Sequence, residues 1–140
     1  MVIRFSFISF LAGTENLVTE AQLQDRVAAA FRLVGEDRDF SEHCGEYALS
    51  IAFGIEEPRI RGLVHIENGR VHWSTGDADD ADLRVTWRRW KDLKRWTESI
   101  TPLWWHRILG RLSMSGKVTP VTQECLYLFR NYFKMMMSRQ

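Results

Sequence analysis

The stretch "RIRGLVHIENGRVHWST" (residues 59–75) decides the fold, because it fixes how two strands pair. Its Asn68-Gly69 step is a strong signal for a two-residue type I′ turn, in which both central residues need a positive φ. Such a turn predicts four facing pairs: Glu67 with Arg70, Ile66 with Val71, His65 with His72, and Val64 with Trp73. Side chains alternate between the two faces of a strand, so the four apolar members share one face. The stretch therefore predicts an antiparallel hairpin with that face buried.

Three further segments show the alternation of a β-strand. In residues 47–55, large apolar side chains alternate with Ala, Ser and Gly, so one face is bulky and the other is small. Residues 83–87 and 111–116 alternate in the same way. Together with the hairpin, these segments predict a sheet of five strands, mainly antiparallel. The apolar positions of the last two are Leu83, Val85, Trp87, Leu112 and Met114.

The first helix is predicted from its capping pattern. Thr19 and Gln22 form a capping box, and apolar side chains follow at helical spacing. Gly35 stands where a C-terminal stop is expected. Residues 36–46 are polar and are predicted to form a loop.

Three more helices are predicted in the second half of the chain. Residues 89–98 carry apolar side chains at helical spacing. Thr101-Pro102 and Thr119-Pro120 are start signals, in which threonine caps the helix and proline takes its first position. With the sheet, these segments predict an α+β protein whose helices cover one face of the sheet.

Length and composition bound the class of protein. A chain of 140 residues is expected to form one domain, which we place at residues 19–140, with an extra N-terminal arm over residues 1–18. The net charge of +1 argues against nucleic-acid binding through a general basic field. Two cysteines are too few for a disulfide framework, and the arm lacks the cleavage site of a signal peptide. We therefore expect a cytoplasmic protein.

The stretch "WRRWKDLKRWTESITPLWW" (residues 87–105) holds five of the six tryptophans. Helical spacing places Trp90, Leu93 and Trp96 on one side and basic residues on the other. The tryptophans are either core residues below a solvated face or the wall of an apolar pocket. The bases offer a third interpretation, contact with anionic lipid headgroups. They are Arg88, Arg89, Lys91, Lys94 and Arg95.

The last helix has an unusually wide apolar surface. Its apolar side chains spread over an arc of roughly 200°, against the ~100° that a core-facing helix needs. Part of this arc is expected to meet something besides the protein's own sheet. The residues concerned are Val121, Cys125, Leu126, Leu128, Phe129, Tyr132, Phe133, Met135, Met136 and Met137.

Few groups in the chain are arranged for metal binding or catalysis. His65 and His72 face each other but lack a local third ligand, and the aspartates of residues 77–82 lack the glycine and glutamate of a calcium loop. His43-Cys44 is expected to hold a loop thiol, and Cys125 to act as a small apolar residue. The sequence contains no nucleophile-elbow, P-loop, dinucleotide-binding or zinc-protease pattern. We expect no metal, no cofactor and no catalytic residue.

Two short motifs resemble the sterol-carrier-protein type of lipid-binding domain. "ADLRV" (residues 81–85) is similar to the strand that precedes a helical pair in that family, and "GRLSMSG" (residues 110–116) to the strand that follows the pair. The resemblance covers about residues 20–136. It implies an apolar cavity between sheet and helices for sterols, fatty acids or acyl-CoA, and usually no catalytic residue. The family typically has smaller aliphatic residues in place of Trp104-Trp105, so these two indoles would take up space that a sterol would fill.

The resemblance and the wide apolar arc predict non-enzymatic binding or transfer of a lipophilic ligand, such as a fatty acyl, sterol or polyprenoid chain. The alternative is an interaction module with a filled core, which forms a homodimer or docks on a partner through the N-terminal arm or the last helix. The expected partners are a lipophilic small molecule and, transiently, an anionic membrane surface, but no nucleic acid. The residues expected to line the cavity are Phe53, Trp87, Trp90, Leu93, Trp96, Trp104, Ile108, Leu112, Met114, Cys125, Leu128, Phe129, Tyr132, Phe133 and Met136.

Overall fold

The computed structural model describes residues 19–46, 48–77, 80–99 and 101–137. The predicted arm of residues 1–18 lies outside the described residues. The strands are β1 (Ala48–Glu57), β2 (Ile60–Glu67), β3 (Arg70–Thr75), β4 (Leu83–Arg89) and β5 (Leu112–Gly116). The helices are α2 (Glu20–Glu36), α3 (Arg38–His43), α4 (Trp90–Glu98), α5 (Leu103–Ile108) and α6 (Pro120–Met137).

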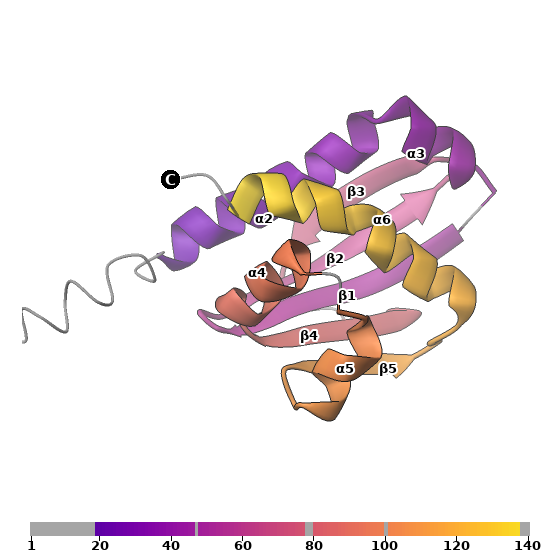
Figure 1. The fold of residues 1–140 in the computed structure, drawn as a ribbon. Helices are drawn as coiled ribbons and strands as arrows, with labels where there is room; N and C mark the ends of the chain where they lie inside the picture. The colour runs from indigo at the N-terminus through magenta and orange to yellow at the C-terminus, as the bar shows by residue number, and fades with distance from the viewer. Residues whose placement is uncertain (1–18, 47, 78–79, 100, 138–140) are drawn as a thin grey trace, which may run out of the picture.

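The strands form one sheet in the order β3-β2-β1-β4-β5 (Figure 1). Three of its pairs are antiparallel, and β1 pairs with β4 in parallel. The prediction of a five-stranded, mainly antiparallel sheet is confirmed, with the parallel pair as an added feature. The middle strand β1 is buried on both faces from Ile51 to Ile55, as expected of a strand with neighbours on each side.

The hairpin of β2 and β3 has the register that the Asn68-Gly69 turn predicts. All four facing pairs are as expected, including His65 with His72 and Val64 with Trp73. Asn68 has φ of 54° and Gly69 of 76°, which is the left-handed backbone that a type I′ turn requires. Since the turn sets the register, it also sets which face of the hairpin meets the helices.

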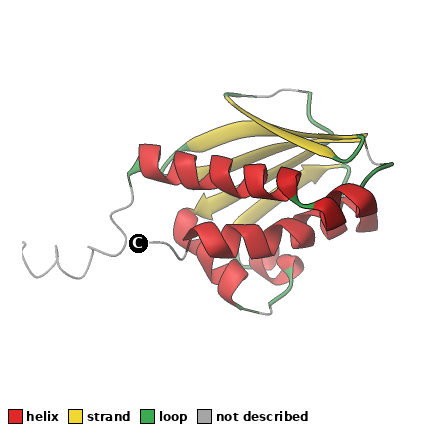
Figure 2. Cartoon of the chain, turned by 90° about the horizontal axis from the view of Figure 1, so that it is seen from above, coloured by secondary structure: helices red, strands yellow, loops and turns green. Residues whose placement is uncertain are grey.

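The helices cover one face of the sheet (Figure 2). Helix α2 begins as predicted, because Gln22 N donates to Thr19 Oγ1 and Thr19 N donates to Gln22 Oε1, both at 3.0 Å. The predicted stop at Gly35 is one residue early, since the helix ends at Glu36. Gly35 instead lies against β3, where an added Cβ would stand 3.3 Å from the carbonyl oxygen of Val71.

The prediction of a loop over residues 36–46 is wrong, because this segment contains helix α3. The Asp37 side chain caps α3 by accepting hydrogen bonds from the backbone N–H groups of Asp39, at 2.8 Å, and Phe40, at 3.3 Å. Phe40 is buried in the core. The Asp37 cap starts this short helix, and the buried Phe40, with Cys44 at the helix end, holds it on the domain.

Helix α6 lies between α2 and α4 above the sheet and contacts both (Figure 1). Its buried apolar residues are Cys125, Leu126, Phe129, Phe133 and Met136. The wide apolar arc is therefore covered largely by two neighbouring helices. Sequence alone could not show this, because α2 and α4 are distant along the chain.

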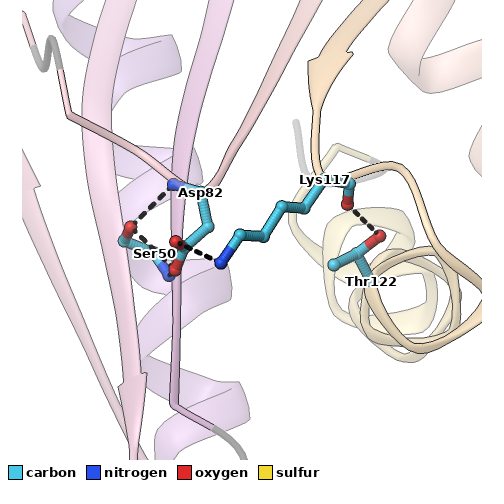
Figure 3. A network of polar contacts seen from close by, with 4 residues as sticks. All are labelled: Ser50, Asp82, Lys117 and Thr122. Carbon is cyan, nitrogen blue, oxygen red and sulfur yellow. Dashed lines mark hydrogen bonds and ion pairs between the residues drawn. The ribbon is translucent and has the colours of Figure 1, made fainter.

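A polar network joins three parts of the sheet at the start of β4 (Figure 3). Asp82 Oδ2 accepts hydrogen bonds from Ser50 N at 3.0 Å and Ser50 Oγ at 3.3 Å, and Ser50 Oγ accepts one from Asp82 N at 2.9 Å. Lys117 Nζ lies 3.4 Å from Asp82 Oδ1, and Thr122 Oγ1 donates to the Lys117 carbonyl at 2.8 Å. The aspartate of the "ADLRV" motif thus holds the parallel pair β1–β4 in register and ties it to the start of α6.

Candidate functional site

An apolar cavity lies between the sheet and the helical layer. It leaves about 10 Å³ for the centre of a water molecule, which is at the lower limit for holding one water. The layer is therefore almost closed. The cavity is lined by Phe31 of α2, Ile51 and Phe53 of β1, Val85 and Trp87 of β4, Trp96 of α4, Leu103 of α5, and Leu126, Phe129 and Phe133 of α6.

Aromatic rings form the part of the lining nearest α2 and α6. The Phe31 ring lies 5.2 Å from Phe129 and 5.1 Å from Phe133, in both cases edge to face. Phe133 also stacks on Phe53 at 5.3 Å. These are the preferred arrangements of aromatic pairs, each contributing about 0.5–1.5 kcal/mol beyond the area that it buries. A ligand entering the cavity would have to separate some of these rings.

One polar group stands in this lining without a partner. The indole Nε1 of Trp96 is buried and makes no hydrogen bond to any residue that the structure describes. The Arg130 guanidinium lies 5.9 Å from the Trp96 ring, and its Nε donates to the Trp96 carbonyl at 3.0 Å. A buried donor without an acceptor is unfavourable, so this nitrogen is a candidate contact for the polar end of a ligand.

The structure brings together five of the fifteen residues expected to line the cavity, namely Phe53, Trp87, Trp96, Phe129 and Phe133. Two others, Leu128 and Tyr132, are half-buried against the core. Trp104 and Ile108 are exposed and lie in a surface groove beside β5, together with Leu112 and Met114. The remaining residues are buried in the core outside the lining: Trp90, Leu93, Cys125 and Met136.

Five of the lining residues were not predicted from the sequence. Phe31 lies on the predicted inner face of the first helix, and Ile51 and Val85 on the predicted inner faces of two strands. Periodicity predicts which face of a helix or strand is buried, but not how far each residue lies from the cavity. That distance depends on how the helices cross the sheet. The five are Phe31, Ile51, Val85, Leu103 and Leu126.

The positive charge of the five bases at the end of β4 and in α4 is partly neutralised by nearby carboxylates. Asp92 is fully buried and pairs with Arg89, whose Nε lies 3.3 Å from Asp92 Oδ2. Lys94 lies 3.8 Å from Glu98 and 5.8 Å from the centre of the Trp90 ring. Of the five bases expected to contact headgroups, Arg88 and Arg95 are exposed, and Lys91 is half-buried.

The predicted loop thiol is a buried one. Cys44 and Cys125 are both fully buried and their side chains are hydrogen-bonded to each other. Burial raises the pKa of the Cys125 thiol to about 12, and that of Cys44 also lies above its ordinary value for the same reason. Neither thiol is therefore ionised near neutral pH, as a nucleophile would need to be. Among the described residues, no three His, Cys, Asp or Glu side chains cluster as a metal site would require.

His106 is a buried titratable group in contact with one of the cavity tryptophans. Its ring packs edge-on against Trp87 at 5.6 Å, and its Nε2 lies 2.9 Å from Thr101 Oγ1. Burial, together with the positive charge of Arg111, lowers the pKa of His106. The neutral ring therefore acts as a packing residue that holds α5 on the sheet.

The sequence matches no family model and gives no significant match to a curated protein. Among solved structures, the fold is similar to that of sterol carrier protein 2 from Yarrowia lipolytica in its apo form, with a TM-score of 0.55 at 12% identity over 85% of this chain and 98% of that chain. It is also similar to palmitated SCP2L2 from Aedes aegypti, with a TM-score of 0.53 at 13% identity over 80% and 95% of the two chains.

A third similar structure is an enzyme, the sec-alkyl sulfatase PisA1 from Pseudomonas sp.. The TM-score is 0.58 at 14% identity, over 82% of this chain but only 16% of the sulfatase. The likeness thus concerns one small part of that enzyme. The likeness to the two sterol-carrier-protein-2 structures shows that this chain has a similar fold, as the two sequence motifs predicted. Within the described residues, no helix has the length and hydropathy to cross a membrane.

Proposed function

We propose that this chain is a non-enzymatic carrier that binds a lipophilic ligand, such as a fatty acyl, sterol or polyprenoid chain, between the sheet and helices α2, α4, α5 and α6. The observation that carries the proposal is the composition of the cavity. All ten of its lining residues are apolar or aromatic, and they come from both layers. Lipophilic ligands bind in pockets of this kind, which have few polar contacts. The likeness to a sterol carrier protein and to a palmitated protein supports this ligand class.

Trp96 is proposed to fix the polar end of the ligand. Its free indole N–H would donate to a carboxylate or carbonyl oxygen, and the adjacent Arg130 guanidinium would attract a negative charge. This arrangement favours a fatty acid or acyl derivative over a plain hydrocarbon. Replacing Trp96 by Phe keeps an aromatic ring but removes the donor. We expect Trp96→Phe to weaken palmitate binding by about threefold to tenfold and to leave hexadecane binding nearly unchanged.

Native mass spectrometry of the purified protein, followed by titration with palmitate, cholesterol and a polyprenol, tests the proposal. Leu126 lines the cavity and Leu128, on the same helix, does not. Leu126→Trp should fill the cavity and reduce affinity by about tenfold or more, whereas Leu128→Trp should leave it within about twofold. Absence of binding for every lipid in the wild-type protein would refute the carrier.

The alternative function, an interaction module with a filled core, is favoured by the small size of the cavity. Exposed apolar residues on α6 also fit a docking role, with Tyr127 40% and Met135 52% exposed. In this case the chain would form a homodimer, or dock on a partner, through α6 or the N-terminal arm. Light scattering of the full chain and of a Met135→Asp variant separates the two functions, since a carrier remains one species in both.

A further inference from the structure

An exposed apolar surface on α5 is not used by the cavity. Of the six large hydrophobic residues that are exposed in the described part of the chain, four lie within residues 104–109. Trp104 is 56%, Trp105 41%, Ile108 70% and Leu109 43% exposed. Clusters of exposed apolar side chains on a small protein usually mark an interaction site. We refer to these four residues and Arg107 as the α5 patch.

The inner side of α5 is anchored, so the orientation of the α5 patch is fixed. Leu103 and His106 are buried, and Leu103 N donates to the Tyr127 hydroxyl at 2.9 Å. Helix α5 lies beside β5 at the edge of the sheet, away from α2 (Figure 1). The two exposed indoles pack edge to face at 5.9 Å. With its inner side held in this way, α5 presents the patch outward at the margin of the domain.

The chain segment that carries the α5 patch has basic residues but no acidic ones. Residues 99–123 contain no aspartate or glutamate, and they include Arg107, Arg111 and Lys117. Arg107, the base within the α5 patch, is exposed. Exposed tryptophans in a segment that has bases and no acidic residues complement the surface of an anionic bilayer, in which negatively charged headgroups lie above an apolar interior.

We propose that the α5 patch docks on the surface of a bilayer that contains anionic lipid. Tryptophan favours the boundary between headgroups and acyl chains, because its ring is apolar and its N–H is polar. Ile108 and Leu109 enter the upper acyl region, while Arg107 remains at the level of the phosphates. This surface is distinct from the five bases of residues 88–95 that the sequence predicted to contact headgroups. Docking does not depend on an occupied cavity.

Flotation of the full chain with vesicles tests the proposal. We compare phosphatidylcholine vesicles with vesicles that also contain phosphatidylglycerol, at low and high salt. Ile108→Asp and Arg107→Glu alter exposed residues of the α5 patch, and circular dichroism confirms that each variant is folded. We expect each variant to lower partitioning into anionic vesicles by about tenfold, and high salt to reduce the advantage of anionic over neutral vesicles.

Two matched controls make the same changes outside the α5 patch. Met135→Asp alters an exposed apolar residue of α6, and Arg59→Glu an exposed base between β1 and β2. Both should bind anionic vesicles as the wild type does. The proposal is overturned if the wild-type chain does not bind anionic vesicles, or if the controls lose binding as the patch variants do. It is also overturned if Ile108→Asp converts a dimer into a monomer without a change in vesicle binding. That result would show that the α5 patch binds a second copy of the chain.

Discussion

Asp82 shows how a single side chain supports the fold. Its carboxylate receives the Ser50 backbone N–H, which lowers its pKa, and the nearby Lys117 ammonium lowers it further. Asp82→Asn keeps the size of the side chain and removes the charge. We expect a loss of about 1–2 kcal/mol in the free energy of unfolding at pH 7, measured by urea denaturation. This is a modest value because the side chain is 34% exposed and its ion pair is screened by solvent.

The pH dependence of this loss follows from the direction of the pKa shift. A carboxyl group whose pKa is lower in the folded state binds fewer protons there than in the unfolded state. Its contribution is fully present above the unfolded pKa and is lost as pH falls through the folded value. The difference between wild type and Asp82→Asn should therefore shrink below about pH 4. Asp77→Asn is the control, because Asp77 is 69% exposed and its ion pair with Arg61 spans 3.6 Å. A change above about 0.5 kcal/mol in the control would show that charge in this region, and not the Asp82 network, sets the effect.

The two thiols provide a second test at the scale of residues. Cys44 and Cys125 are fully buried, and their raised pKa values keep them protonated. We expect Ellman's reagent to react with the native protein at pH 8 more than about a thousandfold slower than with protein unfolded in urea. Rapid labelling of either thiol in the native state would show that α3 or α6 detaches easily from the domain.

At the scale of elements, local signals in the sequence predicted the sheet and most helices correctly. The Asn68-Gly69 turn fixed the hairpin register, and the Thr19 capping box fixed the start of α2. Both signals act between residues that are close along the chain. The parallel pairing of β1 with β4 joins segments on either side of the hairpin, and no turn residue specifies it.

The candidate site was harder to predict than the fold, because it depends on contacts between segments that are distant along the chain. The inward faces of Phe53, Trp87, Trp96, Phe129 and Phe133 follow from periodicity, but the placement of one helix against another does not. Trp104 and Ile108 show the consequence. Periodicity within the six residues of α5 cannot decide which side meets the sheet, and the structure turns Leu103 and His106 inward instead.

Gly62 tests how closely β2, β3 and α2 pack together. An added Cβ would stand 2.1–2.6 Å from three carbon atoms of the Trp73 ring, which in turn stacks on Phe31 at 5.1 Å. Gly62→Ala should therefore displace the indole and reduce the free energy of unfolding by about 2 kcal/mol. The near-ultraviolet circular dichroism of the tryptophans should change with it.

The matched experiment for Gly62 is a double-mutant cycle with Trp73→Leu. If the clash causes the loss, Gly62→Ala costs much less in the Trp73→Leu background than in the wild type. An equal cost in both backgrounds would contradict the contact and point to the strand backbone instead. The cycle thus separates packing in the hairpin from the intrinsic preference of a β-strand for alanine over glycine.

At the scale of the whole molecule, the nearly closed layer determines how a carrier must work. A cavity of about 10 Å³ cannot admit an acyl chain unless α4 or α6 moves away from the sheet. The observed affinity is then the intrinsic affinity reduced by the fraction of molecules that are open. A substitution that weakens the closed packing should consequently raise affinity while it lowers stability. If the chain is an interaction module with a filled core, no substitution is expected to raise ligand affinity while it lowers stability.

Phe133 and Phe40 form a matched pair for this prediction, since both are buried and only Phe133 lines the cavity. Replacing either by Leu removes ring contacts and should lower the free energy of unfolding by roughly 1–2 kcal/mol, measured by urea denaturation. Phe133→Leu should also increase palmitate affinity, by about fivefold for each ~1 kcal/mol taken from the closed layer. Phe40→Leu should not, because Phe40 contacts Phe129 but does not itself line the cavity. If the two variants lose stability equally and neither gains affinity, the layer is a solid core and the chain is not a carrier.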